Sequence, residues 1–127
     1  MKRESINAKN APAPRGGYSQ AVKIEDFKTL VFISGQIPVA DDDKVPETFE
    51  DQARLVWRNI DAQLKAAGMT KADLVKVTTF LSDRHHANAN RDIRSDYLGG
   101  IAPAMSVVIC SIFDEKWLLE VEAIAAQ

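Results

Sequence analysis

One segment of this 127-residue chain carries a regular helical repeat that limits what the rest can form. Its apolar residues recur at spacings of three and four, as on one stripe of an α-helix: Phe49, Ala53, Val56, Ile60, Leu64 and Ala67. Thr48 can cap the first amides, Asp51 suits the positive helix end, and Gly68 suits a left-handed C-terminal cap. The pattern predicts a helix over residues 49–67 with one apolar face that must pack against other elements.

Two apolar runs on either side of Glu25 and Asp26 favour strands. β-branched and aromatic residues are frequent over residues 18–36, and the polar pair in the middle suits a turn. The segment predicts an antiparallel hairpin whose second strand covers residues 28–35. The preceding residues 7–17 contain two prolines and two glycines, which oppose a helix and predict an arm leading into the hairpin.

Downstream of the first helix, residues 73–83 are rich in β-branched residues and predict a strand. Val75, Val77 and Leu81 would share one face of this strand. A second helix is predicted to follow it and to end at Gly99. The apolar residues of that helix fall at intervals of four: Ala89, Ile93 and Tyr97.

The last third of the chain is almost continuously apolar over residues 104–113 and 117–125, which predict a closing hairpin. Strands of this kind are covered on both faces. Two helices cover only one face of the sheet, and the other face would be a larger apolar patch than a monomer usually exposes. We therefore predict an α+β fold that oligomerises through its sheet.

The composition fits one domain over residues 1–127 and argues against nucleic acid and membranes as partners. The chain is 46% apolar and 27% charged, and a chain of this length buries about two thirds of its unfolded surface around one core. Its 16 Lys and Arg are scattered among 18 Asp and Glu, so no nucleic-acid surface is expected. No apolar run approaches the ~20 residues that cross a bilayer, and the first residues lack a signal-peptide core. We expect a cytoplasmic protein with no membrane partner.

Cysteine and histidine do not predict a metal or cofactor site. Cys110 is the single cysteine, so it cannot form an internal disulfide or a structural zinc site by itself, and we interpret it as a buried strand residue. His85 and His86 are adjacent, and neighbouring side chains in an extended segment point in opposite directions. They do not make the one-sided pair of a metal site, and we interpret them as solvated loop residues. We expect no metal and no cofactor.

Two glutamates of the last predicted strand are candidate functional groups. Glu120 and Glu122 alternate with apolar residues, so both carboxylates should leave the strand on one face. Burial of that face in a subunit contact would penalise the charged form and raise the pKa of a glutamate, which a general acid or base near neutral pH requires. The alternative is that both are solvated or paired with lysine, because structural ion pairs outnumber catalytic ones.

Four polar residues lie near predicted element ends, where binding sites are often built and where turn and cap residues are equally common. Their spacing leaves both interpretations open. The nearby glycines form neither a dinucleotide-binding fingerprint nor a P-loop. The four residues are Asn10, Tyr18, Ser34 and Asn90.

Five blocks of the sequence form a recognisable set of motifs: NAPAPRGGYSQAV, FISGQIPV, QARLVWRNIDAQLKAAGMTKADLVKVTTFLSD, PAMS and EVEAIA. In this order, and over nearly the whole chain, they closely resemble the Rid (YjgF/YER057c/UK114) family. The resemblance implies a chorismate-mutase-like α+β fold with two helices on one face of the sheet. It also implies a homotrimer whose sheets form a central barrel, with ligands bound in three clefts between subunits.

The resemblance also implies an activity and a set of site residues. Archetypal members hydrolyse reactive enamines and imines such as 2-aminoacrylate, releasing ammonia without a metal or cofactor. Glu120 matches the residue that orients or activates the water. The family's motifs place four further residues at the substrate: Tyr18, Ser34, Gly35 and Asn90.

The PAMS block departs from the family pattern. Archetypal members carry an arginine where this chain has Met105, and commonly a cysteine where it has Val107. The arginine clamps a substrate carboxylate, and a thioether has neither the charge nor the donors to do so. Met105, Val107 and Ile109 would share one strand face, so we expect an apolar cleft wall that favours a neutral or longer substrate. If carboxylate recognition persists, Arg15 or another nearby cation must supply it.

Three functions are compatible with the sequence. The first is hydrolysis of a non-archetypal imine or enamine, in which Glu120 activates water while the Gly35 amide or Ser34 holds the leaving nitrogen. The second is a non-catalytic or regulatory protein that binds a small metabolite in the apolar cleft or a protein partner on its surface. The third is the ribonuclease activity historically attached to the family, which the acidic balance and the lack of a His/Lys acid–base pair disfavour.

Overall fold

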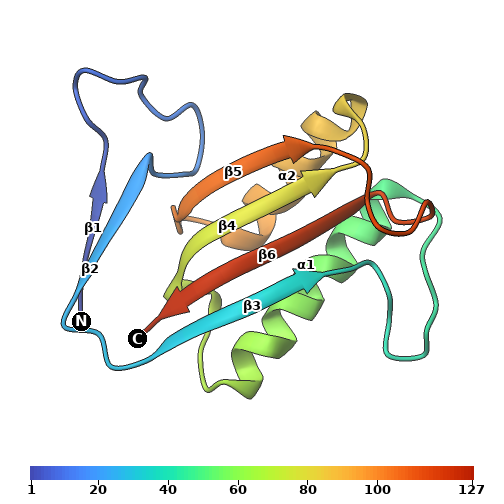
Figure 1. The fold of residues 1–127 in the computed structure, drawn as a ribbon, viewed down its shortest axis with the longest axis horizontal. Coiled ribbons are helices and arrows are strands. Elements are labelled where there is room, and N and C mark those ends of the chain that lie inside the picture. The colour runs from blue at the N-terminus through green and yellow to red at the C-terminus, as the bar shows by residue number, and fades with distance from the viewer.

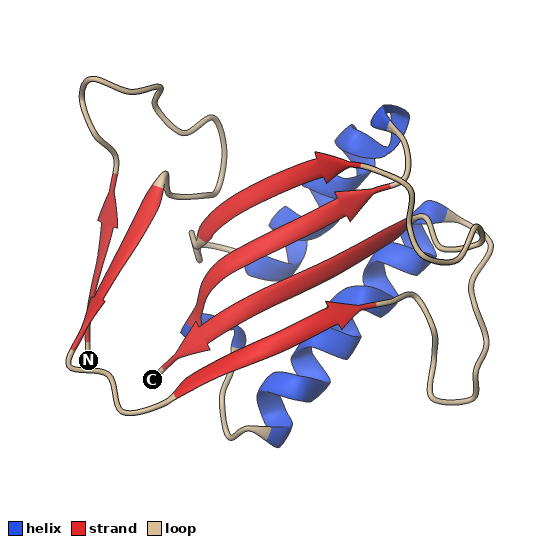
Figure 2. Ribbon diagram, viewed as in Figure 1, coloured by secondary structure: helices blue, strands red, loops and turns tan.

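The computed structural model describes residues 1–127, and at its centre four strands form a sheet with both helices on one face (Figure 1; Figure 2). The strand order is β3-β6-β4-β5, with β6 antiparallel to both of its neighbours and β5 parallel to β4. The sheet strands are β3 Leu30–Gln36, β4 Leu74–Leu81, β5 Ala104–Ile109 and β6 Leu119–Ala126. The other elements are β1 Lys2–Ile6, β2 Ala21–Glu25, α1 Phe49–Ala66, α2 Ala87–Leu98 and the short 3-10 helices η1 Lys71–Asp73 and η2 Arg84–His86. This arrangement confirms the predicted α+β fold.

Helix α1 forms where the apolar repeat predicts it. The Asp51 amide donates to Thr48 Oγ1 (3.1 Å), so the predicted N-cap is present. The chain leaves the helix through Gly68, whose φ of 73° is a conformation that glycine adopts without strain. Val56 and Ile60 on the predicted stripe are fully buried.

The core lies between α1, α2 and the sheet. It contains residues of both helices and of β3, β4 and β6, with Leu119 and Val121 of β6 fully buried. Each such aliphatic side chain stabilises the fold by ~1.5–3 kcal/mol relative to an exposed one. The edge strand β5 adds no fully buried residue to this cluster. Its helix-facing side is therefore available to line a surface hollow.

The predicted pairing within residues 18–36 is wrong. β2 pairs with β1, with Lys2 opposite Glu25, and this two-stranded sheet stands beside the main one (Figure 1). The chain reverses at Asp26, whose φ of 55° is a left-handed conformation that a short polar side chain tolerates, and it then departs from β2 before β3 begins. Sequence reasoning misses β1 because its residues, KRESI, have no apolar alternation.

The predicted closing hairpin is also wrong, because β4 lies between β5 and β6. Residues 110–118 carry the chain around the end of β4. There the Cys110 amide donates to the Leu81 carbonyl (2.9 Å), and the Ser82 amide donates to the Leu118 carbonyl (3.0 Å). This connection is longer than a tight hairpin turn. Cys110 consequently lies in a loop and is only partly buried, which corrects its interpretation as a buried strand residue.

The sheet face opposite the helices is open in the single chain (Figure 2). Phe32 of β3 is 72% exposed and Val108 of β5 is 42% exposed. Glu120 and Glu122 of β6 project to this side, while Val121 between them is buried, as their alternation predicts. An apolar face of this size is the kind that a partner subunit covers. None of the helices has the length and apolar character needed to cross a bilayer.

Candidate active site

Strand β3 bulges beside Glu120. The register between β3 and β6 shifts by one residue between Ile33 and Gln36. Gly35 lies in this bulge, and the Glu120 carboxylate fills the space beside it. A Cβ atom on Gly35 would lie 2.6 Å from Glu120 Cδ and 2.9 Å from its Cγ, far inside van der Waals contact. Glycine is therefore required for Glu120 to keep this position.

The Glu120 side chain borders a small hollow of about 170 Å³ on the open face of the sheet. Phe80 lies directly opposite Glu120 on the neighbouring strand β4. Residues 110–113 form the rest of the wall, and Cys110 and Ser111 are its only other polar groups. Glu120 belongs to none of the ion pairs of the chain. The carboxylate is therefore free to bind water or to accept a proton.

A second hollow, of about 280 Å³, lies beside β5. Ser19 holds the segment before β2 against this strand: its amide donates to the Pro103 carbonyl (3.0 Å) and its Oγ donates to the Ala102 carbonyl (2.6 Å). The hollow is lined by Tyr18, Gln20, Arg94, Met105 and Val107. Tyr18, which the family motif places at the substrate, therefore shares this hollow with Met105 and Val107, the residues expected to form the cleft wall.

Helix α2 carries two buried polar side chains one turn apart. Asn90 is 2% exposed, and its Oδ1 accepts no hydrogen bond. Arg94 is 9% exposed and lines the second hollow. Burial lowers the pKa of Arg94 from its usual value, the positive charge of Arg91 lowers it further, and Tyr18 acts in the opposite direction. A guanidinium nevertheless stays protonated at neutral pH, so this hollow contains a positive charge.

The expected site residues form two groups that do not share a hollow within one chain. Ser34 and Gly35 lie on β3 at Glu120, whereas the other group lines the hollow beside β5. Asn90 lines neither hollow. Arg15, expected as an alternative cation, does not line the second hollow either, although its backbone amide donates to Tyr18 Oη (3.2 Å).

Sequence reasoning missed Arg94. The apolar repeat on α2 predicts that Ile93 is the buried residue of its turn. It therefore predicts that the next residue, Arg94, is exposed to solvent. Met105 and Val107 of β5 lie more than ten residues further along the chain. Only the tertiary packing of α2 beside β5 brings Arg94 to the hollow that they line.

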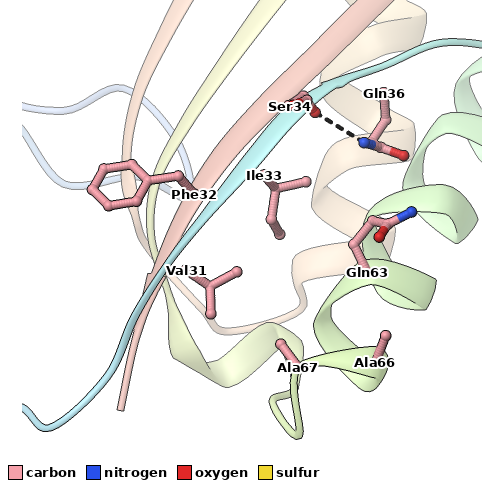
Figure 3. Close-up of a pocket in the computed structure, with 8 residues that line it drawn as sticks. All are labelled: Val31, Phe32, Ile33, Ser34, Gln36, Gln63, Ala66 and Ala67. Atoms are coloured by element: carbon pink, nitrogen blue, oxygen red, sulfur yellow. Dashed lines mark hydrogen bonds between the residues drawn. The ribbon is translucent and has the colours of Figure 1, made fainter.

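A larger hollow, of about 530 Å³, lies between β3 and the C-terminal half of α1 (Figure 3). Val31 and Ile33 point toward the helix, whereas Phe32 points to the other side of the strand. Gln36 Nε2 donates to the Ser34 carbonyl (3.0 Å). Ser34 is the only expected site residue in this hollow, and no ionisable side chain lines it. Its size therefore does not indicate a catalytic site.

The adjacent histidines have different surroundings. His85 is exposed, and its Nδ1 lies 2.6 Å from Asp83 Oδ1. The His86 ring stacks on Phe49 with 4.4 Å between centroids, so it is less solvated than the sequence predicts. Burial lowers the pKa of His86, and the positive charge of His85 lowers it further. No group of three His, Cys, Asp or Glu side chains is placed to hold a metal ion.

Comparison with known proteins shows relatives along the whole chain. Residues 8–127 match the family model described as Endoribonuclease L-PSP. The RutC family protein PH0854 of Pyrococcus horikoshii is 40% identical over 127 residues, which are 97% of each chain. TdcF of Escherichia coli (strain K12), whose name provisionally assigns it as a reactive intermediate deaminase, is 32% identical over 126 residues. That alignment covers 96% of this chain and 95% of TdcF.

Solved structures share the fold. YyfB from Yersinia pestis, described as a protein of unknown function of the conserved Rid family, superposes with a TM-score of 0.85 at 25% identity, over 100% of both chains. TdcF of E. coli with bound serine superposes with a TM-score of 0.73 at 32% identity, over 98% of each chain. The sequence blocks, the helix-covered sheet and these matches lead to one conclusion: the chain belongs to the Rid family, whose model bears the description Endoribonuclease L-PSP.

Proposed function

We propose that this protein hydrolyses an imine or enamine and releases ammonia, at sites formed between the subunits of a homotrimer. The observation that carries the proposal is the Glu120 carboxylate, which lies against Gly35, pairs with no cation and borders a hollow opposite Phe80. A relative along the whole chain, TdcF, is named provisionally as a deaminase of reactive intermediates. Both facts favour water-dependent C=N chemistry.

The reaction needs only the substrate and one water. Glu120 takes a proton from the water as its oxygen bonds to the imine carbon, and the proton passes to the substrate nitrogen. Glu120 then takes the proton of the new hydroxyl group and delivers it to the same nitrogen. The C–N bond breaks, ammonia leaves and a carbonyl group remains. An enamine enters this scheme once a proton has moved from its nitrogen to its carbon, which converts it into the imine, and no step calls for a metal or cofactor.

Two groups near Glu120 can hold the nitrogen during these steps. Gly35 lies against the carboxylate, and Ser34 is the exposed neighbour of Gly35 in the same bulge. The Gly35 amide or the Ser34 hydroxyl would hold the leaving nitrogen while Glu120 moves the protons. β-bulges are common beside active sites because they redirect side chains and backbone groups.

Two observations support the proposed homotrimer, namely the separation of the two hollows and the open sheet face. Glu120 borders one hollow, and Tyr18, Met105 and Val107 line the other. Neighbouring copies that cover Phe32 and its surroundings would place Glu120 of one subunit beside the Tyr18, Met105 and Val107 of the next. The small-molecule substrate would then bind between subunits. We propose that the shape of this substrate differs from that of archetypal Rid substrates, because Met105 stands in the cleft wall in place of an arginine.

The alternative is a protein that binds a metabolite and does not transform it. The structure of TdcF contains bound serine, so a protein of this fold holds a small amino acid. The two functions differ in whether the Glu120 carboxylate is needed for turnover.

The test is ammonia release from imines generated in solution, some by an amino-acid oxidase and others, without a carboxylate, by an amine oxidase. Wild type should accelerate release, and Glu120→Gln should lower the rate at least ~100-fold, the usual contribution of a general base. Glu122→Gln, on the same strand face, is the matched control and should retain the rate.

Equal activity of Glu120→Gln and wild type would contradict the mechanism. Activity of Met105→Arg with none in wild type would show that the natural protein does not perform this hydrolysis. If wild type and Met105→Arg both bind an imine-derived product and neither hydrolyses an imine, the binding function is favoured.

A further inference from the structure

Arg94 is a buried cation without an anionic partner in the chain. It is 9% exposed, and it belongs to none of the ion pairs. Arg91, one turn earlier on the same helix, is exposed and donates to Asn88 Oδ1 (3.4 Å). Buried charges are normally paired, because removing an ion from water costs free energy that a partner must offset. Arg94 lines the hollow beside β5, so an anion that entered this hollow would supply the partner that the chain lacks.

The surroundings of Arg94 suit a small carboxylate. Met105 and Val107 form an apolar wall, which lowers the local dielectric and strengthens a charge-assisted hydrogen bond. The planar guanidinium presents two parallel N–H donors that match the two oxygens of a carboxylate. Tyr18 Oη accepts the Arg15 amide, which leaves its own O–H free to donate to a ligand. A hollow of about 280 Å³ has room for a molecule of a few heavy atoms.

We propose that Arg94, together with Tyr18, forms a carboxylate-binding site in the hollow beside β5, so that the substrates are imines that carry a carboxylate. This inference rests on the proposed deaminase function. It replaces the expectation of a neutral substrate, because the charge missing at Met105 enters the same hollow from helix α2. Arg94 is in this view the residue that determines which imines bind.

The alternative partner for Arg94 is an acidic side chain of a neighbouring copy. In that case the guanidinium would stabilise the assembly and would not contact the substrate. The two possibilities differ in measurable ways: a ligand site depends on the ligand's carboxylate, whereas a subunit contact changes the mass of the assembly.

The direct test is binding of pyruvate, the 2-oxo acid left by hydrolysis of a small imino acid, compared with its neutral amide, pyruvamide. Titration calorimetry should show that Arg94→Met weakens pyruvate binding ~10- to 100-fold, as expected for a lost hydrogen bond to a charged group. Pyruvamide affinity should change far less. Arg91→Met removes the same charge one turn away and should leave both affinities unchanged, while Arg94→Lys should recover part of the pyruvate affinity.

The turnover test separates this inference from the proposed function. With imines made in solution, Arg94→Met should raise KM for carboxylate-bearing imines, so that their kcat/KM falls at least 10-fold relative to that of carboxylate-free imines. Hydrolysis with no change in this ratio overturns the Arg94 site and leaves the deaminase intact. Arg94-dependent pyruvate binding without hydrolysis of any imine overturns the deaminase and leaves the site intact.

Equal pyruvate affinity of wild type and Arg94→Met, or no pyruvate binding by wild type, overturns the inference. A fall in assembly mass for Arg94→Met at unchanged pyruvate affinity identifies the subunit contact instead.

Discussion

The carboxylate of Glu120 occupies the space that a side chain on Gly35 would need. The two residues belong to neighbouring strands, and the β3 bulge brings the backbone of one under the side chain of the other. The position of Glu120 on β6, the proposed proton-transfer group, therefore depends on the absence of a side chain at Gly35 on β3.

Replacing Gly35 with alanine should displace Glu120. The new Cβ would lie 2.6 Å from Glu120 Cδ, so either the carboxylate or the bulge must move. Because the clashing atoms belong to a side chain that can rotate away, we expect a small loss of about 0.5–1 kcal/mol in the free energy of unfolding, together with a loss of ammonia release. Chemical denaturation and the imine assay measure the two effects.

The control for this substitution is Gly17→Ala. Nothing lies within 4 Å of a Cβ at Gly17. Its stability should stay within about 0.5 kcal/mol of wild type. A Gly35→Ala protein with wild-type stability and turnover would show that the close approach of Gly35 to Glu120 is not needed for function.

A charge placed on the open sheet face should break the assembly. Phe32 is 72% exposed in the single chain, and burial of a glutamate at that position between subunits would cost desolvation energy. Phe32→Glu should lower the mass measured by sedimentation or light scattering from that of the proposed trimer to that of a monomer. Ala62→Glu adds the same charge to an exposed position on α1 and should leave the mass unchanged. An unaltered trimer in Phe32→Glu would place the subunit interface elsewhere.

Acidification should destabilise the protein partly through His86. Its pKa is lowered in the folded chain, chiefly by burial and then by the charge of His85, so the unfolded state binds the proton more readily. Stability should therefore decrease as the pH falls from about 7 through the ordinary histidine pKa of about 6.5 to the lower folded value. Melting temperatures between pH 7.5 and 5 should decline less steeply for His86→Asn than for wild type. An equal decline in both proteins would assign the effect to other groups.

The family's ribonuclease description predicts RNA binding, and the charge of this chain predicts the opposite. The chain has a formal charge of −2, and RNA affinity of the usual kind rests on many Lys and Arg contacts to phosphate. We expect no retention of single-stranded RNA at low salt and no cleavage on prolonged incubation. Binding that weakens steeply with added salt would contradict this expectation and would reopen the ribonuclease function.

Elements with local signals could be predicted from the sequence, and pairings between distant segments could not. The repeat, the Thr48 cap and Gly68 define α1 within one continuous stretch. The alternation around Glu120 likewise places the carboxylate on the correct face. Strand order has no such signature: residues 110–118 resemble a hairpin connection until β4 is known to lie between the strands they join.

The same distinction explains what was found of the candidate site. Motif resemblance identifies Tyr18 and Met105, and the structure places both at one hollow. Arg94 has no motif, and its charge suggests an exposed residue until α2 is packed beside β5. A site built from three distant segments is visible to sequence reasoning only where a known pattern records it.

The bulge at Ser34 and Gly35 also bears on how the chain avoids self-association into fibrils. β3 has β6 as its only strand neighbour, so its outer edge presents unpaired backbone donors and acceptors. Flat, regular edges of this kind recruit further strands and lead to aggregation. The register shift before Gln36 makes the last residues of that edge irregular. The irregularity that positions Glu120 therefore also protects the sheet, and a variant that straightened β3 would gain a template for amyloid-like pairing.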